Sequence, residues 1–400
     1  MKCDVTIIGG GMAGLSLACL LGQAGIKVMC LDSAPSNAQR SGDERTTAIS
    51  YGSQKVLEAI GIWDSLTPHA CPIEDIHILD GDDSPLLLQF LSDEVEGKAF
   101  GWIIENALIR ETLTKRARTL ITHKAPAKVR DFEISDDCAV TILDDGTRIE
   151  SALVIGADGR GSFTRGWMGV DIRTQDYGQR AVVFITEHEN PHHNKAVEHF
   201  YEQGPFAVLP MVDDVKGRGK VKHRSAVVFT EHGPQSQSMM TLPDSEFAQL
   251  LRARFPAFYG AVALRGKRTC YPLSLVHAAE YIGPRMALVA DAAHGIHPVA
   301  GQGLNLGFRD VKEMADLLIS AHETGADLGA PELLQTYQRR RRPDNMAMVA
   351  VTDGLVKLFG KKSPPFRLAR RLGLRAVAKI PLAKRFFMRQ AMADRRLMEK

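Results

Sequence analysis

Cysteine is scarce in this sequence and shows no regular spacing. The six cysteines (Cys3, Cys19, Cys30, Cys71, Cys138 and Cys270) contain no C-x-x-C pair. This pattern argues against a disulfide framework and favours buried thiols in a reducing compartment.

Long apolar runs are also missing. No stretch reaches the 18 or so residues that a membrane-spanning helix needs. The stretch from Val5 to Ile26 superficially resembles a signal peptide, but glycines interrupt it, Asp4 precedes it and no A-x-A cleavage site follows. We therefore expect a cytoplasmic protein.

The net charge of +3 is too small to indicate a nucleic-acid partner, but the charge is unevenly distributed. Residues 360–400 hold thirteen Lys and Arg against only Asp394 and Glu399. Phe386, Phe387, Met388 and Met392 lie among these basic residues. The segment is a candidate for docking on the inner face of an anionic membrane or on an accessory protein, and a solvated basic helix is the alternative.

A glycine-rich turn follows the first predicted strand, Cys3 to Ile8, and opens a predicted helix, Met12 to Ala24. Gly9-Gly10-Gly11-Met12-Ala13-Gly14 fits G-x-G-x-x-G, in which the glycines allow a tight turn, close approach to a pyrophosphate and close packing of helix on strand. A second strand, Lys27 to Leu31, ends at Asp32, which is placed to accept hydrogen bonds from ribose hydroxyls. The context predicts a Rossmann dinucleotide site but does not separate FAD from NAD.

Two distant segments repeat the pattern of a buried strand that ends in an aspartate at a turn of small residues. They are Leu153 to Ala157, followed by Asp158, and Met286 to Ala290, followed by Asp291. A single aspartate of this kind is usually a helix cap. Two of them beside a Rossmann start favour ligand contacts at the carboxyl edge of one parallel sheet.

The segment from His297 to Asp310 carries the strongest signal. Gly301, Gly303 and Gly307 allow the backbone to approach a planar ligand, and the predicted helix Leu304 to Ser320 points its N-terminus at that ligand. The positive end of this helix would stabilise the negative charge of a reduced flavin.

At these residues the chain resembles the group A flavoprotein monooxygenases, which are p-hydroxybenzoate hydroxylase-like, and within them the ubiquinone-biosynthesis hydroxylases. Further matches are Asp43 to Ser50, Gly204 to Pro210, Tyr271 to Leu273 and Thr352 to Phe359. Two positions depart from the family pattern: Asp32 stands where the family usually has Glu, and Ala290 stands where it has Gly.

The resemblance implies an α/β fold in which a Rossmann-like FAD-binding domain is interrupted by a mixed-sheet substrate domain and followed by a helical C-terminus. We place the FAD-binding domain at 1–70, 101–175 and 270–345, the substrate domain at 71–100 and 176–269, and a helical basic region at 346–400. A helix near Asn106 to Leu120, a small meander at 128–150, and strands through Arg180 to Thr269 are expected within them.

By motif position, the resemblance also implies a set of FAD contacts: Gly9, Gly11, Met12, Ala13, Gly14, Asp32, Arg45, Asn106, Arg110, Asp158, Asp291, Gly301, Gln302, Gly303, Leu304 and Asn305. Arg45 would pair with the diphosphate. Phe206, Tyr271 and Pro298 are candidates to line the substrate ring, and core packing is the alternative for Tyr271 and Pro298.

The implied activity is hydroxylation of the aromatic ring of a polyprenylated phenol through a flavin C4a-hydroperoxide. NAD(P)H or another donor would reduce FAD, O2 would be the co-substrate, and other ubiquinone-biosynthesis proteins are possible partners. No catalytic side chain can be named; for His297, a structural role is favoured over proton relay. The alternatives are a related reductase or halogenase-like flavoprotein, although Gly101-Trp102-Ile103-Ile104 does not match the halogenase motif, or a flavin-binding subunit without activity.

One cluster in the sequence has the composition of a metal site. Glu187, His188, His192, His193, Glu198 and His199 lie close together in the sequence, but their spacing fits no compact site. We expect no metal.

Overall fold

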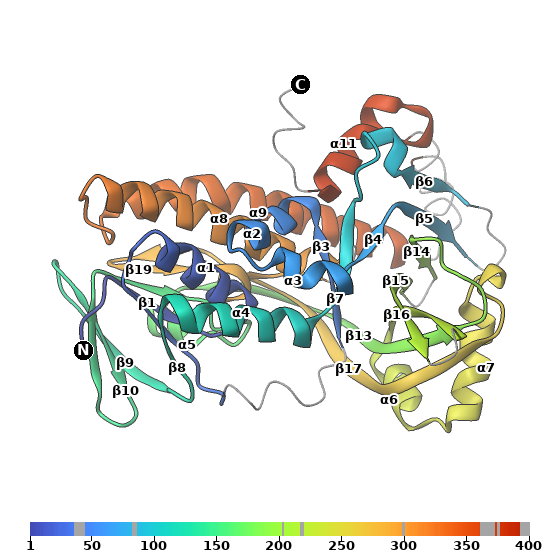
Figure 1. The fold of residues 1–400 in the computed structure, drawn as a ribbon, viewed down its shortest axis with the longest axis horizontal. Helices are drawn as coiled ribbons and strands as arrows, with labels where there is room; N and C mark the ends of the chain where they lie inside the picture. The colour runs from blue at the N-terminus through green and yellow to red at the C-terminus, as the bar shows by residue number, and fades with distance from the viewer. Residues whose placement is uncertain are drawn as a thin grey trace.

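The computed structural model describes residues 1–35, 45–81, 86–201, 204–216, 220–297, 301–360, 373 and 377–392. Figure 1 shows the sheets side by side, with long helices along one edge of the molecule. Asp43, Glu44 and Pro298, and most of the basic C-terminal segment, lie outside the described residues.

A six-stranded sheet forms the nucleotide-binding half. Its strand order is β18-β19-β12-β1-β2-β8, and every neighbouring pair is parallel except β18 with β19. The strands are β1 (Val5–Ile8), β2 (Val28–Leu31), β8 (Thr122–Lys124), β12 (Leu153–Gly156), β18 (Ile282–Gly283) and β19 (Met286–Leu288). Because β1, β12 and β19 are parallel neighbours, their carboxyl ends bring three distant turns to one edge, as the sequence predicted.

Two further small sheets flank this half. A meander of β9 (Val129–Ile134), β10 (Ala139–Leu143) and β11 (Arg148–Ser151) confirms the prediction for 128–150. A second small sheet has the order β3-β7-β4 and consists of β3 (Thr46–Ser50), β4 (Cys71–Ile73) and β7 (Gly101–Glu105).

An eight-stranded sheet forms the other half. Its order is β20-β17-β13-β16-β15-β14-β5-β6. The strands are β5 (Asp75–Asp80), β6 (Leu88–Leu91), β13 (Ile172–His188), β14 (Lys195–Phe200), β15 (Pro205–Lys216), β16 (Lys220–His232), β17 (Val262–Ala278) and β20 (His294–Gly295). The long strands β13 and β17 run between the two halves of the molecule (Figure 1).

Strands were expected throughout 180–269, and this is wrong for 233–254. That segment forms α6 (Gly233–Thr241) and α7 (Asp244–Arg254), whose buried Met239, Phe247 and Leu251 pack on one face of the eight-stranded sheet. These helices are stabilised by burial of one apolar stripe against the sheet. The local sequence has too weak a helical periodicity to predict them.

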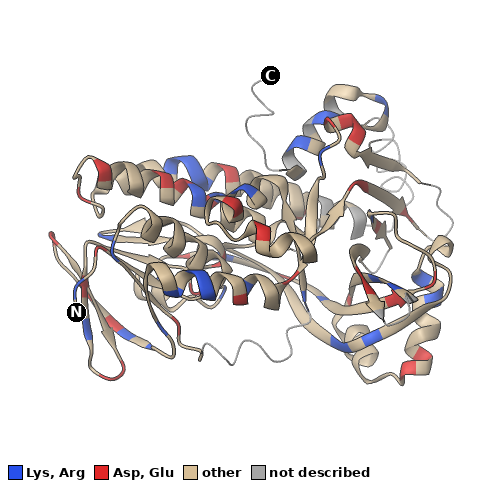
Figure 2. Ribbon diagram, viewed as in Figure 1, with Lys and Arg blue, Asp and Glu red and all other residues tan. Residues whose placement is uncertain are grey.

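The remaining helices confirm the main helical predictions and the helical C-terminus. They are α1 (Met12–Gln23), α2 (Tyr51–Ala59), α3 (Trp63–Leu66), α4 (Asn106–Leu120), α5 (Phe163–Trp167), α8 (Gln302–Glu323), α9 (Pro331–Gly360) and α11 (Pro381–Met392), with 3-10 turns η1 (Thr67–His69), η2 (Ser92–Val95), η4 (Ala257–Tyr259) and η5 (Ala290–Ala292). α11 lies beside η2, where Lys384 pairs with Glu94, and Figure 2 shows stretches of ribbon coloured for basic and for acidic residues next to each other there. In the described part of the chain, no helix combines the length and the apolar character that crossing a bilayer requires.

Candidate functional site

A cavity of about 610 Å³ lies between the two halves of the molecule. One side is formed by the glycine turn after β1, strand β3, the turns after β12 and β19, and the start of α8. The other side is formed by one face of the eight-stranded sheet and by Met388 of α11. The cavity therefore joins the predicted dinucleotide site to an apolar wall.

The glycines of the first turn have separate physical roles. Gly9 has φ +111°, and a Cβ on it would lie 2.3 Å from the carbonyl oxygen of Ala157. A Cβ on Gly14 would lie 2.0 Å from the carbonyl oxygen of Gly9, so only glycine lets α1 approach β1 this closely. Around Gly11, by contrast, no atom lies within 4 Å of the added Cβ, and the residue lines the cavity. This open space beside Gly11 fits a diphosphate at the N-terminus of α1.

Asp32 ends β2 at the same edge. Its carboxylate accepts hydrogen bonds from the backbone N–H groups of Gly10 (3.0 Å) and Ala34 (2.9 Å). These bonds fix the shorter acid beside the glycine turn, and a carboxylate has lone pairs left for ribose hydroxyls. The position agrees with the predicted ribose contact.

The two later aspartates have different surroundings. Asp158 accepts hydrogen bonds from the hydroxyls of Ser162 and Thr164 and from the N–H of Thr164 (2.9 Å), so its carboxylate caps the start of α5. Asp291 lines the cavity, with its nearest ionic partner, Arg160 Nε, 3.5 Å away. Asp291 is therefore the better placed of the two for direct contact with a ligand.

Ala290 explains the family preference for glycine at this position. Its φ is +53°, in the left-handed region that residues other than glycine adopt at a cost in conformational energy. Its N–H donates to the buried carboxylate of Asp310 (3.0 Å), which holds the strained turn in place.

The segment that opens α8 lies against β3. The Asn305 side chain accepts a hydrogen bond from Ser50 N–H (3.0 Å) and donates to the carbonyl oxygens of Ala48 (2.9 Å) and Gly301 (3.0 Å). Gly301 is the N-cap, with φ +63°. Five consecutive residues, Gly301, Gln302, Gly303, Leu304 and Asn305, all line the cavity, so the helix N-terminus faces it as predicted.

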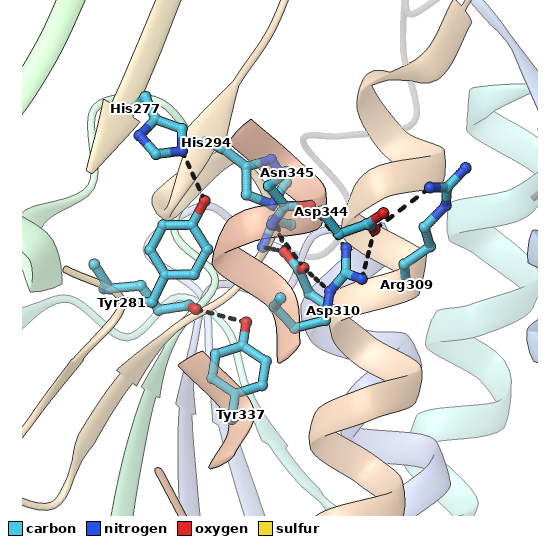
Figure 3. Close-up of polar contacts among 11 residues, drawn as sticks. His277, Tyr281, His294, Arg309, Asp310, Tyr337, Asp344 and Asn345 are labelled. Carbon is cyan, nitrogen blue, oxygen red and sulfur yellow. Dashed lines mark hydrogen bonds and ion pairs between the residues drawn. The ribbon is translucent and has the colours of Figure 1, made fainter. Parts of the chain in front are cut away.

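A buried polar network anchors this helix (Figure 3). Only part of this network was predicted from the sequence. Asp310 bonds to His294 Nε2 (2.5 Å), to Arg341 Nε (2.7 Å) and to Asn345 Nδ2 (3.1 Å). Burial would raise the pKa of Asp310, but His294 and Arg341 hold it well below its usual range. His294, Arg341 and Asn345 were missed because no local pattern links them to position 310.

Arg45, Asn106 and Arg110 lie at the ends of β3 and β7 and on α4. The guanidinium of Arg45 lies 4.9 Å from the centre of the Tyr271 ring, and its carbonyl accepts from Asn106 N–H (2.9 Å). Asn106 Oδ1 accepts from the hydroxyl of Thr47, which lines the cavity (2.6 Å). Arg45, Asn106 and Arg110 are not among the residues that line the cavity, and their flavin contacts remain a prediction.

The substrate-lining candidates fare differently. Phe206 is fully buried with Phe229 and Phe255 in the core on the other face of the sheet, so the prediction for it is wrong. Side chains alternate along a strand, and its neighbours Pro205 and Ala207 face the cavity instead. Tyr271 stacks under Arg45, and Pro298 lies outside the described residues.

The histidine-rich segment is held by ordinary hydrogen bonds. His188 Nδ1 bonds to Asn190 O (2.7 Å), His192 Nε2 to Met211 O (2.9 Å) and His199 Nε2 to Gly81 O (2.7 Å). Within the residues that the structure describes, no group of three or more His, Cys, Asp or Glu side chains is arranged to hold a metal ion.

Comparisons of the chain with known proteins give three results. The FAD binding domain family matches residues 2–352. The chain is 42% identical over 398 residues to the ubiquinone hydroxylase UbiL of Rhodospirillum rubrum, covering 98% of this chain and 90% of the relative. It is 30% identical to the 3-demethoxyubiquinol 3-hydroxylase of Escherichia coli, covering 97% and 98%. Its fold matches p-nitrophenol 4-monooxygenase from Pseudomonas putida with a TM-score of 0.78 at 20% identity, covering 97% of each chain.

Proposed function

Because this chain belongs to the FAD-binding hydroxylase family of ubiquinone biosynthesis, we propose that it hydroxylates the aromatic ring of a polyprenylated phenol. It is an FAD-dependent monooxygenase that takes O2 and a reduced electron donor. The observation that supports the substrate class is that one cavity runs from the glycine turn to an apolar wall large enough for a substituted ring.

The residues present fit the flavin. The open space at Gly11 would accept the diphosphate, Asp32 the adenosine ribose, Asp291 a hydroxyl of the ribityl chain, and the N-terminus of α8 the polar edge of the ring. Bound FAD supplies the activation of O2 and the transfer of one oxygen atom to the ring.

The chain's own part is to position the substrate and exclude water. Ile73, Ile76, Phe90, Phe100 and Leu209 give the cavity an apolar wall, which favours a ring with a hydrocarbon substituent. A dry site also protects the reactive oxygen donor from hydrolysis. His297 lines the cavity, and burial followed by the charge of Arg160 lowers its pKa to about 4, so it is neutral at physiological pH.

We also propose that α11 contacts an anionic membrane surface, from which a polyprenylated substrate would enter. Met388 lines the cavity, while Ile380, Leu382 and Phe387 are exposed, as is the basic Arg385. This combination is typical of a peripheral amphipathic helix. Co-sedimentation with vesicles should increase with their anionic lipid content. Binding that does not depend on anionic lipid would contradict the proposed membrane contact.

Turnover tests the hydroxylase proposal. The FAD-loaded protein is mixed with NAD(P)H and a prenylated phenol, and the product is analysed by mass spectrometry. We expect NAD(P)H oxidation to accelerate and one oxygen atom from O2 to appear on the ring. Bound flavin with no phenol-stimulated turnover would instead favour a non-catalytic flavin-binding subunit.

A further inference from the structure

One carboxyl group stands in the apolar wall of the cavity, and neither the fold nor the flavin contacts account for it. The described residues that line the cavity from the eight-stranded sheet include a single ionisable side chain, that of Glu198 on β14. This strand lies between β5 and β15 in the half of the molecule away from the glycine turn (Figure 1).

The register of the sheet places Glu198 on the face that lines the cavity. Glu198 pairs with Ile78 on β5 and with Ala207 on β15, and Ala207 in turn pairs with Val228 on β16. All four residues line the cavity, so Glu198 belongs to one cross-strand row whose other members are apolar. Ala196 and Phe200, two residues away on either side along β14, line it as well.

The carboxyl group is not neutralised by its surroundings. Within the described part of the chain, it makes no hydrogen bond or ion pair, and burial alone raises its pKa to about 7. Glu198 is half-buried at the cavity surface. A carboxyl held against apolar surroundings without a partner costs free energy, and such groups concentrate at sites where a ligand supplies the partner.

A second polar group on the same wall is also unsatisfied. Thr230 on β16 is 1% exposed, lines the cavity, and its Oγ1 has no hydrogen-bond partner within the described residues. Two unsatisfied polar groups on an otherwise apolar wall indicate a ligand with an apolar body and at least one hydrogen-bonding substituent. A substituted phenol has this chemistry.

We propose that Glu198 binds the ring hydroxyl of the substrate phenol and accepts its proton. The inference rests on the proposed function, because it names a catalytic residue of that reaction. The phenol O–H bond breaks, a new O–H bond forms on the carboxylate, and the electron pair stays on the phenolate oxygen. Donation of this pair into the ring makes the ring carbon a better nucleophile toward the oxygen donor. When the aromatic ring is restored, the ring carbon that took the oxygen loses its proton to water, and Glu198 returns its own proton to the ring oxygen.

The other titratable groups around the cavity are few. Arg160, Asp291 and His297 line its flavin side, and His297 is neutral above a pKa of about 4. The neighbours that face the cavity from β5, β15, β16 and α11 at Ile78, Ala207, Val228 and Met388 are not titratable. A change of rate near pH 7 is therefore assigned to Glu198.

The test uses the FAD-loaded protein with an ortho-prenylated phenol and its O-methyl ether, which lacks the donating O–H. For the wild type, we expect the phenol to bind on the order of tenfold more tightly than the ether, and turnover of the phenol to rise with pH through 7. In Glu198→Gln, we expect kcat to fall about a hundredfold, the rise through pH 7 to disappear, and the preference for phenol over ether to be lost. Flavin content should not change.

A matched variant controls for the loss of a carboxylate from the same sheet. Glu187→Gln removes a carboxylate on β13 that pairs with Arg265 (3.2 Å) and Lys222 (3.2 Å), and Glu187 is not among the residues lining the cavity. We expect its pH profile and its phenol preference to match the wild type.

The outcomes separate the two proposals. A Glu198→Gln protein that keeps both the pH profile and the preference for phenol overturns the role of Glu198. A wild type that hydroxylates no phenol contradicts the proposed function. In that case, the preference for phenol over ether in binding still tests whether Glu198 binds the phenol hydroxyl. If Glu198→Gln does not fold, equal binding of phenol and ether by the wild type overturns the inference without it.

Discussion

The backbone N–H of Ala290 donates to Oδ2 of Asp310 over 3.0 Å. This bond joins the turn after β19 to the first half of α8, two segments that both line the flavin side of the cavity. Asp291 follows Ala290 directly, so its place in the cavity depends on a residue nineteen positions further along the chain.

Asp310→Asn is expected to destabilise the protein. Arg341 is 2% exposed and would lose its buried anionic partner, although Asp344 at 2.7 Å remains. Breaking a buried ion pair from one side costs about 3 kcal/mol of the free energy of unfolding, which denaturant titration measures. Asp316→Asn on the same helix removes only the exposed pair with Lys312, and we expect a change within about 0.5 kcal/mol. Equal effects of the two variants would contradict the anchoring role.

Substitutions of two glycines in the first turn should separate folding from cofactor binding. In Gly14→Ala, the new methyl group would lie 2.0 Å from a backbone oxygen, so we expect little folded protein. In Gly11→Ala, the methyl group points into open space, so the fold should be kept while FAD affinity falls at least tenfold, because the diphosphate needs that space. Circular dichroism and the flavin-to-protein ratio measure both. Full FAD binding by Gly11→Ala would contradict the placement of the diphosphate beside Gly11.

Asp291→Ala should give a folded but colourless protein. Asp291 lines the cavity, and its ionic partner there is Arg160, which also bonds to the carbonyl oxygens of Ser274 and Ile296 and so stays in place. Loss of a hydrogen bond to a charged group is expected to weaken FAD binding at least tenfold. Flavin titration followed by fluorescence measures this affinity. Retention of stoichiometric flavin would place Asp291 outside the flavin site.

The stability of the protein should fall in mild acid. Burial, followed by the charges of His294, Arg342 and Arg173, lowers the pKa of His277 to about 4, against about 6.5 in the unfolded chain. The unfolded state therefore binds more protons as the pH falls below 6.5, and His277 contributes a loss of up to about 3 kcal/mol by pH 4. Nε2 of its ring and the hydroxyl of Tyr281 share a hydrogen bond (3.0 Å) in the buried site.

Denaturant titrations between pH 7 and pH 4 measure this dependence. In His277→Asn, the slope of the free energy of unfolding against pH should decrease by the contribution of about one proton. His297, whose pKa is also lowered to about 4, continues to contribute to this slope. A wild-type free energy of unfolding that stays constant across this range would show that His277 is not held neutral by the fold.

Local patterns predicted the flavin side of the site well. The turn Gly9 to Gly14 and the helix that opens after Gly301 are set by backbone conformation, which a few neighbouring residues decide. Asp158 shows the limit of such a pattern, because a strand-end aspartate that caps its own helix has the same sequence signature as one that binds a ligand.

The substrate side was predicted poorly. Phe206 and Glu198 lie in neighbouring strands. The sequence favoured Phe206 as a ring contact and named Glu198 only within a cluster whose spacing fits no metal site. The register of the sheet turns Glu198 toward the cavity and Phe206 into the core, since a shift of one residue moves a side chain to the opposite face.

The sequence by itself determined the Rossmann start, the parallel strand ends with their turns, and membership of an FAD-binding family, because these follow from short-range geometry and from motifs. Only the tertiary structure decided which face of the eight-stranded sheet closes the cavity, which aspartate remains open to a ligand, and that His294, Arg341 and Asn345 converge on Asp310. These depend on pairings between strands and helices far apart in the chain, which no local pattern records.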